Sequence, residues 1–279
     1  MKAAVRRLEE TRVGAPAGRV ARRVLGRERT PSFRYVFVVT YGRSGSTLVQ
    51  GLLNTLPRVL MRGENGFYLL PLFHAMASVD GFRHTHLRHH PRAQNSAFYG
   101  LHVIKPRSFV TMTRTIVTGH LLGRVDPQSV DVLGFKEVLW YRVQPAETGP
   151  FFDFLDRAFP GCLYVLNERE HARVVGSGFW QAKDEGTVLE AIERVEDIQG
   201  FLRRTRPERT LDVRYELLTS DDPAVSEAQL KSLAEFVHGS CDDHLLETMR
   251  GTLEIGHGPY PFGTSRNRRE RRQRHSANH

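Results

Sequence analysis

Apolar residues follow two alternating patterns along this chain. Short continuous runs rich in β-branched and aromatic residues are typical of buried parallel strands, and they occupy residues 35–40, 130–137, 162–167 and 210–215. The segments between them carry apolar residues at helical spacing, over residues 48–54, 66–79, 108–122, 151–159, 171–180, 184–205 and 226–238. This alternation predicts an α/β fold of three layers, in which a central parallel sheet is flanked by helices.

The two ends of the chain differ from the middle in composition. Residues 1–32 are rich in Arg with Gly, Ala and Pro, and residues 266–279 are basic and of low complexity. We therefore expect three parts, namely a basic N-terminal arm (1–32), one folded domain (33–265) and a basic C-terminal tail (266–279).

The net charge indicates which partners the chain could bind. Its 279 residues include 40 Lys and Arg against 31 Asp and Glu, for a net charge of +9, which fits nucleic acid, an acidic membrane surface or a polyanionic small molecule. The N-terminus is charged throughout, and no stretch reaches the roughly 18 apolar residues of a membrane span. We therefore expect a soluble, cytoplasmic protein, and peripheral membrane contact stays open. The sequence is silent on oligomeric state.

Neither cysteines nor histidines are spaced as metal ligands usually are. Cys162 and Cys241 lie far apart and form no disulfide framework either. Residues 80–98 read as a polar surface loop in which the histidine spacing fits no standard zinc site. We expect no metal in this loop, whose clustered histidines are His84, His86, His89 and His90.

The first strand runs into a loop that is suited to bind an anion. Consecutive backbone N–H groups around glycines form a nest for an anion, and the following helix adds its positive N-terminal end. Hydroxyl groups and one forked guanidinium add further donors. The loop consists of Gly42, Arg43, Ser44, Gly45, Ser46 and Thr47. Strand, glycine loop and helix in this order open a P-loop-like nucleotide-binding unit.

The loop nevertheless differs from a Walker A loop, which reads G-x-x-x-x-G-K-[ST]. Its glycines, Gly42 and Gly45, are only three positions apart, and no Lys precedes Ser46 or Thr47. No predicted strand ends in an Asp placed to hold magnesium. The pattern indicates an anion other than a magnesium nucleoside triphosphate, and on spacing alone a plain turn between strand and helix stays the alternative.

Residues 41–48 resemble the 5′-phosphosulfate loop of the sulfotransferases that use 3′-phosphoadenosine 5′-phosphosulfate (PAPS). The form R-S-G-S is closest to the carbohydrate-modifying and bacterial branches. Two further segments match in the same order, and the resemblance covers roughly residues 35–240. Arg169, with Ser177 eight residues later, is similar to the 3′-phosphate motif, although Glu170-His171 replaces the usual Asp-Pro. Tyr215 stands in a segment similar to Y-E-D-L, whose Tyr lies near the adenine.

The resemblance implies that the chain moves a sulfuryl group from PAPS to a hydroxyl or amine of an acceptor, releasing 3′-phosphoadenosine 5′-phosphate (PAP). We expect no metal, because a sulfuryl group carries less charge than a phosphoryl group and its transfer does not require one. Saccharide, glycolipid and small metabolite all stay open as acceptors, and the resemblance favours one that contains carbohydrate. No nucleic-acid motif accompanies the basic residues, so we expect no nucleic-acid partner.

Three residues are candidates for the chemistry. Arg43 would stabilise charge on the departing phosphate oxygens. The resemblance assigns Lys136, at the end of the strand at 130–137, to the bridging oxygen, and Glu64, where a second strand should end, to the general base. It also suggests that Arg266, in a late glycine-rich loop, closes the 3′-phosphate site. Weaker candidates for the base are His74, His102 and Glu137.

Two other kinds of function stay open at this point. A small-molecule kinase of the P-loop class would need the magnesium and the Walker lysine that the loop does not provide for. A protein of the same fold could also bind PAP or a related nucleotide without catalysis.

Overall fold

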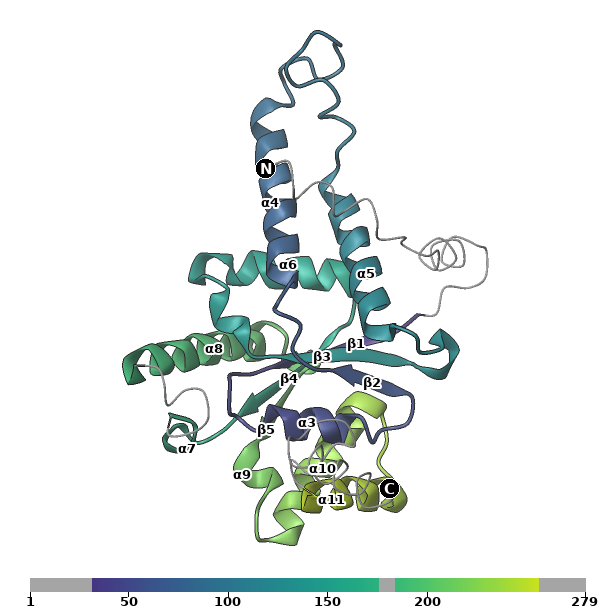
Figure 1. Cartoon of the computed structure of the whole chain (residues 1–279), viewed down its shortest axis with the longest axis vertical. Helices are drawn as coiled ribbons and strands as arrows, with labels where there is room; N and C mark the ends of the chain where they lie inside the picture. Colours follow the sequence, from purple (N-terminus) through teal and green to yellow (C-terminus); the bar gives the residue numbers. More distant parts are fainter. Residues whose placement is uncertain (1–31, 176–183, 256–279) are drawn as a thin grey trace, which may run out of the picture. The chain divides into compact units, whose positions relative to one another are not determined.

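The computed structural model describes residues 32–175 and 184–255 (Figure 1). The elements described below all belong to the unit that begins at Phe33. Five strands occur among these described residues, and they all pair in parallel, in the order β2-β3-β1-β4-β5. The predicted α/β fold with a central parallel sheet is therefore confirmed. The strands are β1 (Arg34–Val39), β2 (Val59–Arg62), β3 (Val132–Glu137), β4 (Leu163–Glu168) and β5 (Thr210–Arg214).

The alternation of side chains along β1 shows how the sheet separates two cores. Tyr35, Phe37 and Val39 pack into one hydrophobic cluster, and Val36 and Val38 pack into another. Because successive side chains of a strand point to opposite faces, both faces of this strand are covered, as a near-continuous apolar run requires.

Helices cover both faces of the sheet (Figure 1). The first face packs against α4 (Leu69–His86), α5 (Pro106–Leu122), α6 (Thr148–Ala158) and α8 (Glu185–Thr205), and the second against α3 (Ser46–Leu53), α10 (Pro223–His238) and α11 (Asp243–Ile255). Two short helices, α7 (His171–Val175) and α9 (Tyr215–Leu218), follow β4 and β5. Short 3₁₀ turns stand at Pro127–Ser129, Leu139–Arg142, Pro145–Glu147 and Pro207–Arg209. No helix among the described residues combines the length and the apolar character of a membrane span.

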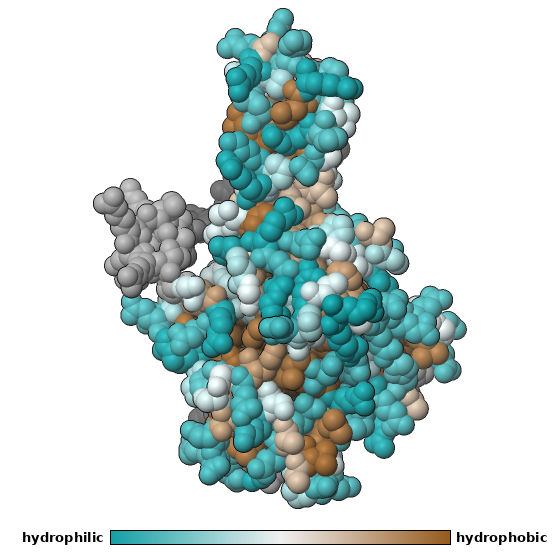
Figure 2. All heavy atoms as spheres, turned by 180° about the vertical axis from the view of Figure 1, so that it is seen from behind, coloured by the Kyte–Doolittle hydropathy of each residue, from teal (hydrophilic) through white to brown (hydrophobic). Residues whose placement is uncertain are grey.

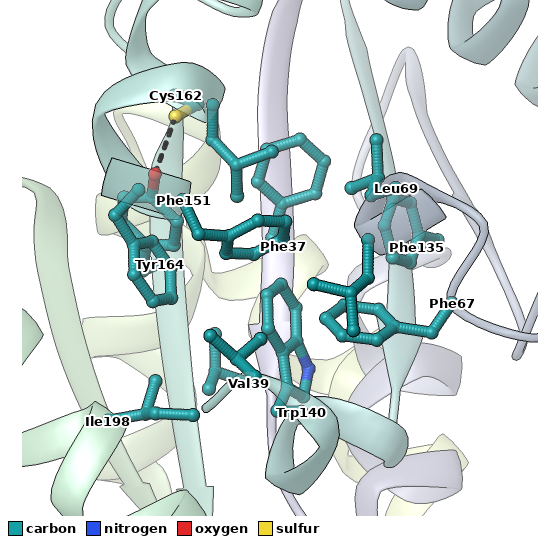
Figure 3. Packing of buried hydrophobic residues seen from close by; sticks show 14 of the residues in the cluster. Phe37, Val39, Phe67, Leu69, Phe135, Trp140, Phe151, Cys162, Tyr164 and Ile198 are labelled. Atoms are coloured by element: carbon teal, nitrogen blue, oxygen red, sulfur yellow. Dashed lines mark hydrogen bonds between the residues drawn. The ribbon is translucent and has the colours of Figure 1, made fainter. Parts of the chain in front are cut away.

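Aromatic side chains fill the first core (Figure 3). The indole of Trp140 stacks on the ring of Phe152, with centroids 6.0 Å apart and planes at 12°, and meets Phe67 edge-on at 4.9 Å. Trp140 is fully buried, and its Nε1 donates to the carbonyl of Val38 at 3.2 Å. This contact ties the turn after β3 to the end of β1.

Most predicted bounds differ from the structure by one to three residues, and two differences are larger. We expected residues 80–98 to be a loop, but α4 continues to His86, so His84 and His86 lie on a helix. The apolar periodicity fades there because this part of α4 extends beyond the core and has little to pack against. The helix α11 was not predicted, although Leu245, Leu246 and Met249 all pack into the second core.

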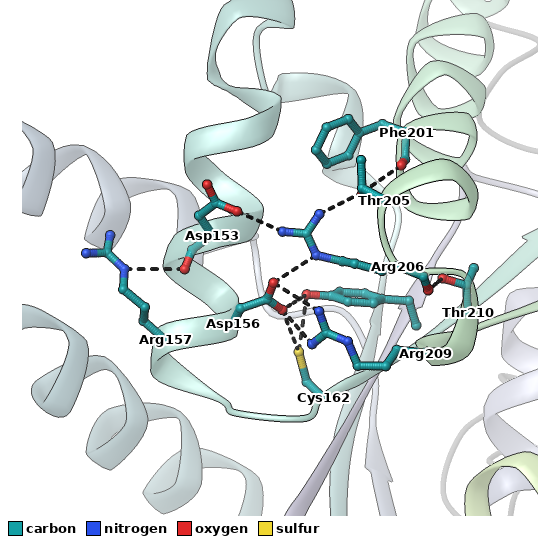
Figure 4. A network of polar contacts seen from close by, with 10 residues as sticks. Asp153, Asp156, Arg157, Cys162, Phe201, Thr205, Arg206, Arg209 and Thr210 are labelled. Carbon is teal, nitrogen blue, oxygen red and sulfur yellow. Dashed lines mark hydrogen bonds and ion pairs between the residues drawn. The ribbon is translucent and has the colours of Figure 1, made fainter.

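A polar network holds α6, β4 and the end of α8 together, at the edge of the sheet where β4 begins (Figure 4). Asp156 on α6 accepts from Arg206 Nε at 2.9 Å and from Arg209 Nη1 at 2.8 Å. The side chain of Arg206 is only 6% exposed, and its Nη2 also reaches Asp153. Burial alone would raise the pKa of Asp156, but the hydrogen bonds and positive charges of Arg209 and Arg206 hold this pKa below its ordinary value.

We expect Asp156→Asn to lower the free energy of unfolding by about 1–3 kcal/mol, because it leaves the nearly buried Arg206 short of a carboxylate. Asp153→Asn is the matched control, since Asp153 binds the same arginine but its side chain is 73% exposed, and it should change stability little. Thermal unfolding measures the stability of both variants.

The stabilising effect of Asp156 should also depend on pH. A carboxylate whose pKa is lower in the folded than in the unfolded state stabilises the protein at pH values above its unfolded pKa. This stabilisation is lost as the pH falls through the folded pKa. The difference between wild type and Asp156→Asn should therefore shrink below about pH 4, and a difference that stayed constant would contradict this account.

Candidate active site

All five strands end at the same edge of the sheet, and this edge carries the candidate residues. The chain leaves β1 through α3 on one face, and it passes from β3 to β4 through α6 on the other. In open parallel sheets such a change of face opens a crevice at the carboxyl ends of the strands, where ligands bind.

The loop after β1 adopts the left-handed backbone conformation, which glycine favours, at two positions. Gly45 adopts φ 83° and caps the N-terminus of α3, and Arg43 adopts φ 69°, which is unusual for a residue with a side chain. A Cβ atom on Gly45 would lie 2.1 Å from a ring carbon of Tyr215. Both the left-handed backbone and the close approach of this ring therefore require glycine at position 45.

Buried hydrogen bonds fasten the loop to the end of β4. Thr40 Oγ1 donates to the carbonyl of Asn167 at 2.9 Å, and Asn167 Nδ2 donates to the carbonyl of Ser44 at 3.0 Å. The hydroxyl of Ser44 lies 2.6 Å from that of Thr40, and all three residues are fully buried. The side chain of Ser44 therefore belongs to the support of the loop. Asn167 was not among the predicted site residues, and its only signal in the sequence is that it is a polar residue at the end of an apolar strand.

Arg169, the first residue after β4, lies against the same loop. Its Nη1 donates to the carbonyl of Arg43 at 3.1 Å, and its guanidinium carbon lies 4.1 Å from the ring centroid of Tyr215. Its Nε is buried and has no hydrogen-bond partner among the described residues. Tyr41 holds the backbone of Arg169, since its hydroxyl accepts from the N–H at 2.9 Å and donates to the carbonyl at 2.8 Å. Burial raises the pKa of Tyr41, so its hydroxyl keeps the proton that it donates.

Lys136 and Glu64 form an ion pair at the ends of β3 and β2. In the parallel register Arg62 stands opposite Phe135, so Glu64, two residues beyond β2, comes level with the end of β3. The side chain of Lys136 is 8% exposed and that of Glu64 is 49% exposed. The pair therefore joins a nearly buried cation to a carboxylate that solvent and ligands can reach.

Glu137 is a structural residue that holds backbone segments together. It is fully buried, and its two carboxylate oxygens accept from the backbone N–H groups of Asn65, Phe67, Val138 and Leu139 at 2.8–3.2 Å. These bonds fix the segment after β2, which carries Glu64, to the end of β3. All hydrogen-bonding positions of this carboxylate are therefore occupied, so it could not take a proton from a bound substrate as a general base.

Most of the candidate residues line one cavity of about 310 Å³, although Ser44 and Tyr215 do not. It contains cations from the ends of β1, β3 and β4, together with the N-terminal residues of α3 and one carboxylate. The α3 helix has no acidic residue in its first turn, so its positive end is not offset there. The lining residues are Gly42, Arg43, Gly45, Ser46, Thr47, Glu64, Lys136, Val138 and Arg169.

A second cavity, of about 400 Å³, shares Glu64 with the first. Tyr68 Oη and Asn65 Nδ2 are buried without a hydrogen-bond partner among the described residues. Burial raises the pKa of Tyr68 to about 12, so this phenol is a donor at neutral pH. Its ring meets that of His120 edge-on at 5.4 Å. The cavity is lined by Arg62, Gly63, Glu64, Asn65, Tyr68, His120 and Leu121.

The remaining candidates lie elsewhere. His74 on α4 pairs with Glu147 at 2.9 Å, and His102 Nδ1 lies 3.0 Å from the carbonyl of Pro91; neither residue lines either of the two cavities. Ser177 and Arg266 fall outside the residues that the structure describes. Over residues 32–175 and 184–255, no group of three or more His, Cys, Asp or Glu side chains could hold a metal ion.

The model of a family described as "Sulfotransferase family" matches residues 35–238, a range that contains every residue lining the two cavities. A search of curated protein sequences found no match. Among solved structures, a sulfotransferase from Mycobacterium avium is 14% identical, with a TM-score of 0.41, and the alignment covers 82% of this chain and 69% of that one.

Proposed function

Because this chain belongs to the sulfotransferase family, we propose that it transfers a sulfuryl group from PAPS to a hydroxyl or amine of an acceptor, in the cytoplasm. The observation that carries the proposal is the convergence of Arg43, Lys136 and Arg169 on one cavity at the N-terminus of α3. PAPS bears a phosphosulfate and a separate 3′-phosphate. Three cations and a helix N-terminus are the groups that stabilise such a polyanion.

The roles of the cavity residues follow from which bond forms and which bond breaks in the reaction. The acceptor oxygen forms a bond to sulfur while the bond from sulfur to the bridging phosphate oxygen breaks, so negative charge grows on the departing PAP. Arg43, Lys136 and the backbone N–H groups of the loop would stabilise this charge. Glu64 would take the proton that the acceptor hydroxyl loses. Arg169 and Tyr215 would hold the adenosine 3′-phosphate end of the donor, with Ser177 and Arg266 as further contacts.

The second cavity is our candidate for the acceptor site. It meets the first cavity at Glu64, which is where a base must stand between an acceptor and a donor. Asn65 Nδ2 and Tyr68 Oη offer two buried hydrogen-bond donors without a partner among the described residues. Such groups favour an acceptor that carries several oxygen atoms, because a buried unpaired donor is costly. A carbohydrate-containing acceptor fits this requirement.

Thermal unfolding of the full chain with PAP, AMP and Mg-ATP tests the proposed donor. A ligand that binds only the folded state raises the melting temperature. We expect PAP to stabilise the protein equally with and without magnesium, and AMP, which lacks the 3′-phosphate, to stabilise it less. Stabilisation by Mg-ATP alone would favour a kinase. Stabilisation by PAP without turnover of labelled PAPS on any of a broad set of acceptors would favour a binding protein of the same fold.

A further inference from the structure

Exposed apolar side chains gather at one end of the domain. The helices α4 and α5 extend away from the sheet, and the segment between them closes the far end of this pair (Figure 1). We refer to residues 82–107 as the hairpin tip. Of the large hydrophobic residues that are exposed in the described part of the chain, only Met112, Leu217 and Val225 lie outside the hairpin tip. The others are Phe82, Leu87, Tyr99, Val103 and Ile104.

These side chains are open to solvent to an unusual degree. Val103 is 67% exposed, Tyr99 56%, Phe82 51% and Ile104 48%. Figure 2 shows apolar residues among hydrophilic ones on this projection. Single exposed apolar residues are ordinary, but several of them together on one surface indicate a site of interaction.

The hairpin tip carries positive charge and no negative charge. No Asp or Glu occurs between Asp80 and Asp126. The tip itself contains Arg83, Arg88, Arg92, Lys105 and Arg107, and all of them except Arg83 are exposed. A surface that combines cations with apolar side chains and lacks acidic residues is complementary to an anionic and partly apolar partner.

Contacts inside the hairpin tip explain why its apolar residues stay outside. The ring of Phe98 stacks on that of His86, with centroids 4.5 Å apart and planes at 11°. Arg83 donates to the carbonyls of Leu101 and Ile104. The N–H of Gly100 donates to the carbonyl of Pro91 at 2.9 Å. The interior is thus filled by Phe98 and its neighbours, and the backbone carries Val103 and Ile104 on the surface.

We propose that the hairpin tip is a docking surface for an anionic lipid membrane. Its cations would lie at the lipid headgroups, and Tyr99, Val103 and Ile104 would enter the boundary with the acyl chains. Nucleic acid would satisfy the cations, but it offers nothing that the aliphatic side chains of Val103 and Ile104 would gain by burial. A second copy of the chain would bring two positive surfaces together, which like-charge repulsion opposes. The proposal does not rest on the sulfuryl donor, so the ligand-free protein can test it.

The experiment must separate the hairpin tip from the basic ends of the chain, which would also bind anionic vesicles. An environment-sensitive fluorophore at position 103 does this, introduced as Val103→Cys in a Cys241→Ser background, since Cys162 is buried. We expect blue-shifted, brighter emission with phosphatidylcholine vesicles that contain about 30% phosphatidylserine, and no change with phosphatidylcholine alone. The same fluorophore at position 217, an exposed apolar position on α9, is the control and should stay in water.

Charge variants provide a second measurement, by sedimentation with the same vesicles. Arg88→Glu/Arg92→Glu should weaken binding by about tenfold or more, because each cation near an anionic membrane contributes about a factor of five. The matched control Arg204→Glu/Lys231→Glu makes the same change of net charge on α8 and α10 and should weaken binding by at most about twofold. Unchanged melting temperature and unchanged stabilisation by PAP show that each variant is folded.

Three results would overturn the proposal. The fluorophore at position 103 could remain in water while the protein sediments with vesicles, which would assign the binding to the basic ends. It could respond to single-stranded nucleic acid and not to vesicles. The charge variant at the hairpin tip could bind as well as its matched control. None of these outcomes bears on PAP binding, so failure here leaves the proposed sulfuryl transfer intact.

Discussion

Replacing Glu64 by Gln is expected to lower kcat by about two to four orders of magnitude, the usual contribution of a general base. The substitution keeps the size of the side chain and its place between the two cavities, but the amide cannot accept the proton of the acceptor. Stabilisation by PAP should not fall, because the carboxylate has no favourable contact with an anion and its removal leaves the charge of Lys136 available to the donor. The measurement is turnover of labelled PAPS with an acceptor found by screening. Glu190→Gln, an exposed site on α8, is the matched control.

The ion pair with Lys136 gives Glu64 a second candidate role, which the experiment must separate from catalysis. Glu64→Gln leaves the nearly buried ammonium of Lys136 without its carboxylate, and an unpaired buried charge is destabilising. If Glu64 serves only to neutralise Lys136, and Lys136 has no part in the reaction, then Glu64→Gln/Lys136→Met should restore most of the lost turnover, because both charges are removed together. If both residues take part in the reaction, the double variant should be at least as inactive as Glu64→Gln. Wild-type turnover in Glu64→Gln would exclude Glu64 as the base.

The sheet could be predicted from the sequence because its strands carry a signal that does not depend on their partners. The runs at 35–40, 130–137, 162–167 and 210–215 are apolar at nearly every position, as strands buried on both faces must be, and each corresponds to an observed strand. The order β2-β3-β1-β4-β5 could not be derived in the same way. It depends on which edges pair, and this is decided by packing between residues that are far apart in the chain.

The convergence of the cations was the predictable part of the site. Arg43 and Arg169 each follow an apolar run, and parallel strands bring their carboxyl ends to one edge whatever their order in the sheet. The structure brings both residues to one cavity. Their roles toward a donor are predictions.

The contacts that support the site could not be predicted, because they depend on register and burial. Glu137 looks like a free carboxylate in the sequence, and only the register of β2 against β3 shows that four backbone N–H groups surround it. The second cavity needs Tyr68, before α4, and His120, at the end of α5, to lie together. A segment of about 50 residues separates them in the sequence, and no local pattern in it indicates that its ends meet.

Replacing Arg169 by Ala is expected to weaken PAP binding by about 10- to 100-fold, as the loss of charged hydrogen bonds to a phosphate implies. Isothermal titration with PAP and with AMP distinguishes two ways in which Arg169 could act. If it binds the 3′-phosphate, Arg169→Ala should reduce the affinity for PAP and leave that for AMP, which has no 3′-phosphate, nearly unchanged. Arg204→Ala, at the far end of α8, is the matched control and should alter neither affinity.

The contacts of Arg169 make the second way a real alternative. Its guanidinium donates to the carbonyl of Arg43 and lies over Tyr215, whose ring packs on Gly45. If Arg169 acts by holding the loop in shape, Arg169→Ala should reduce the affinities for PAP and for AMP by the same factor. Both ligands carry the 5′-phosphate that the loop would bind. Arg169→Lys separates the two roles further, because it keeps the positive charge but loses the planar guanidinium. An intermediate affinity for PAP would indicate that the charge contacts the phosphate directly. Affinities for PAP and AMP as low as those of Arg169→Ala would indicate that Arg169 acts through its packing on Tyr215.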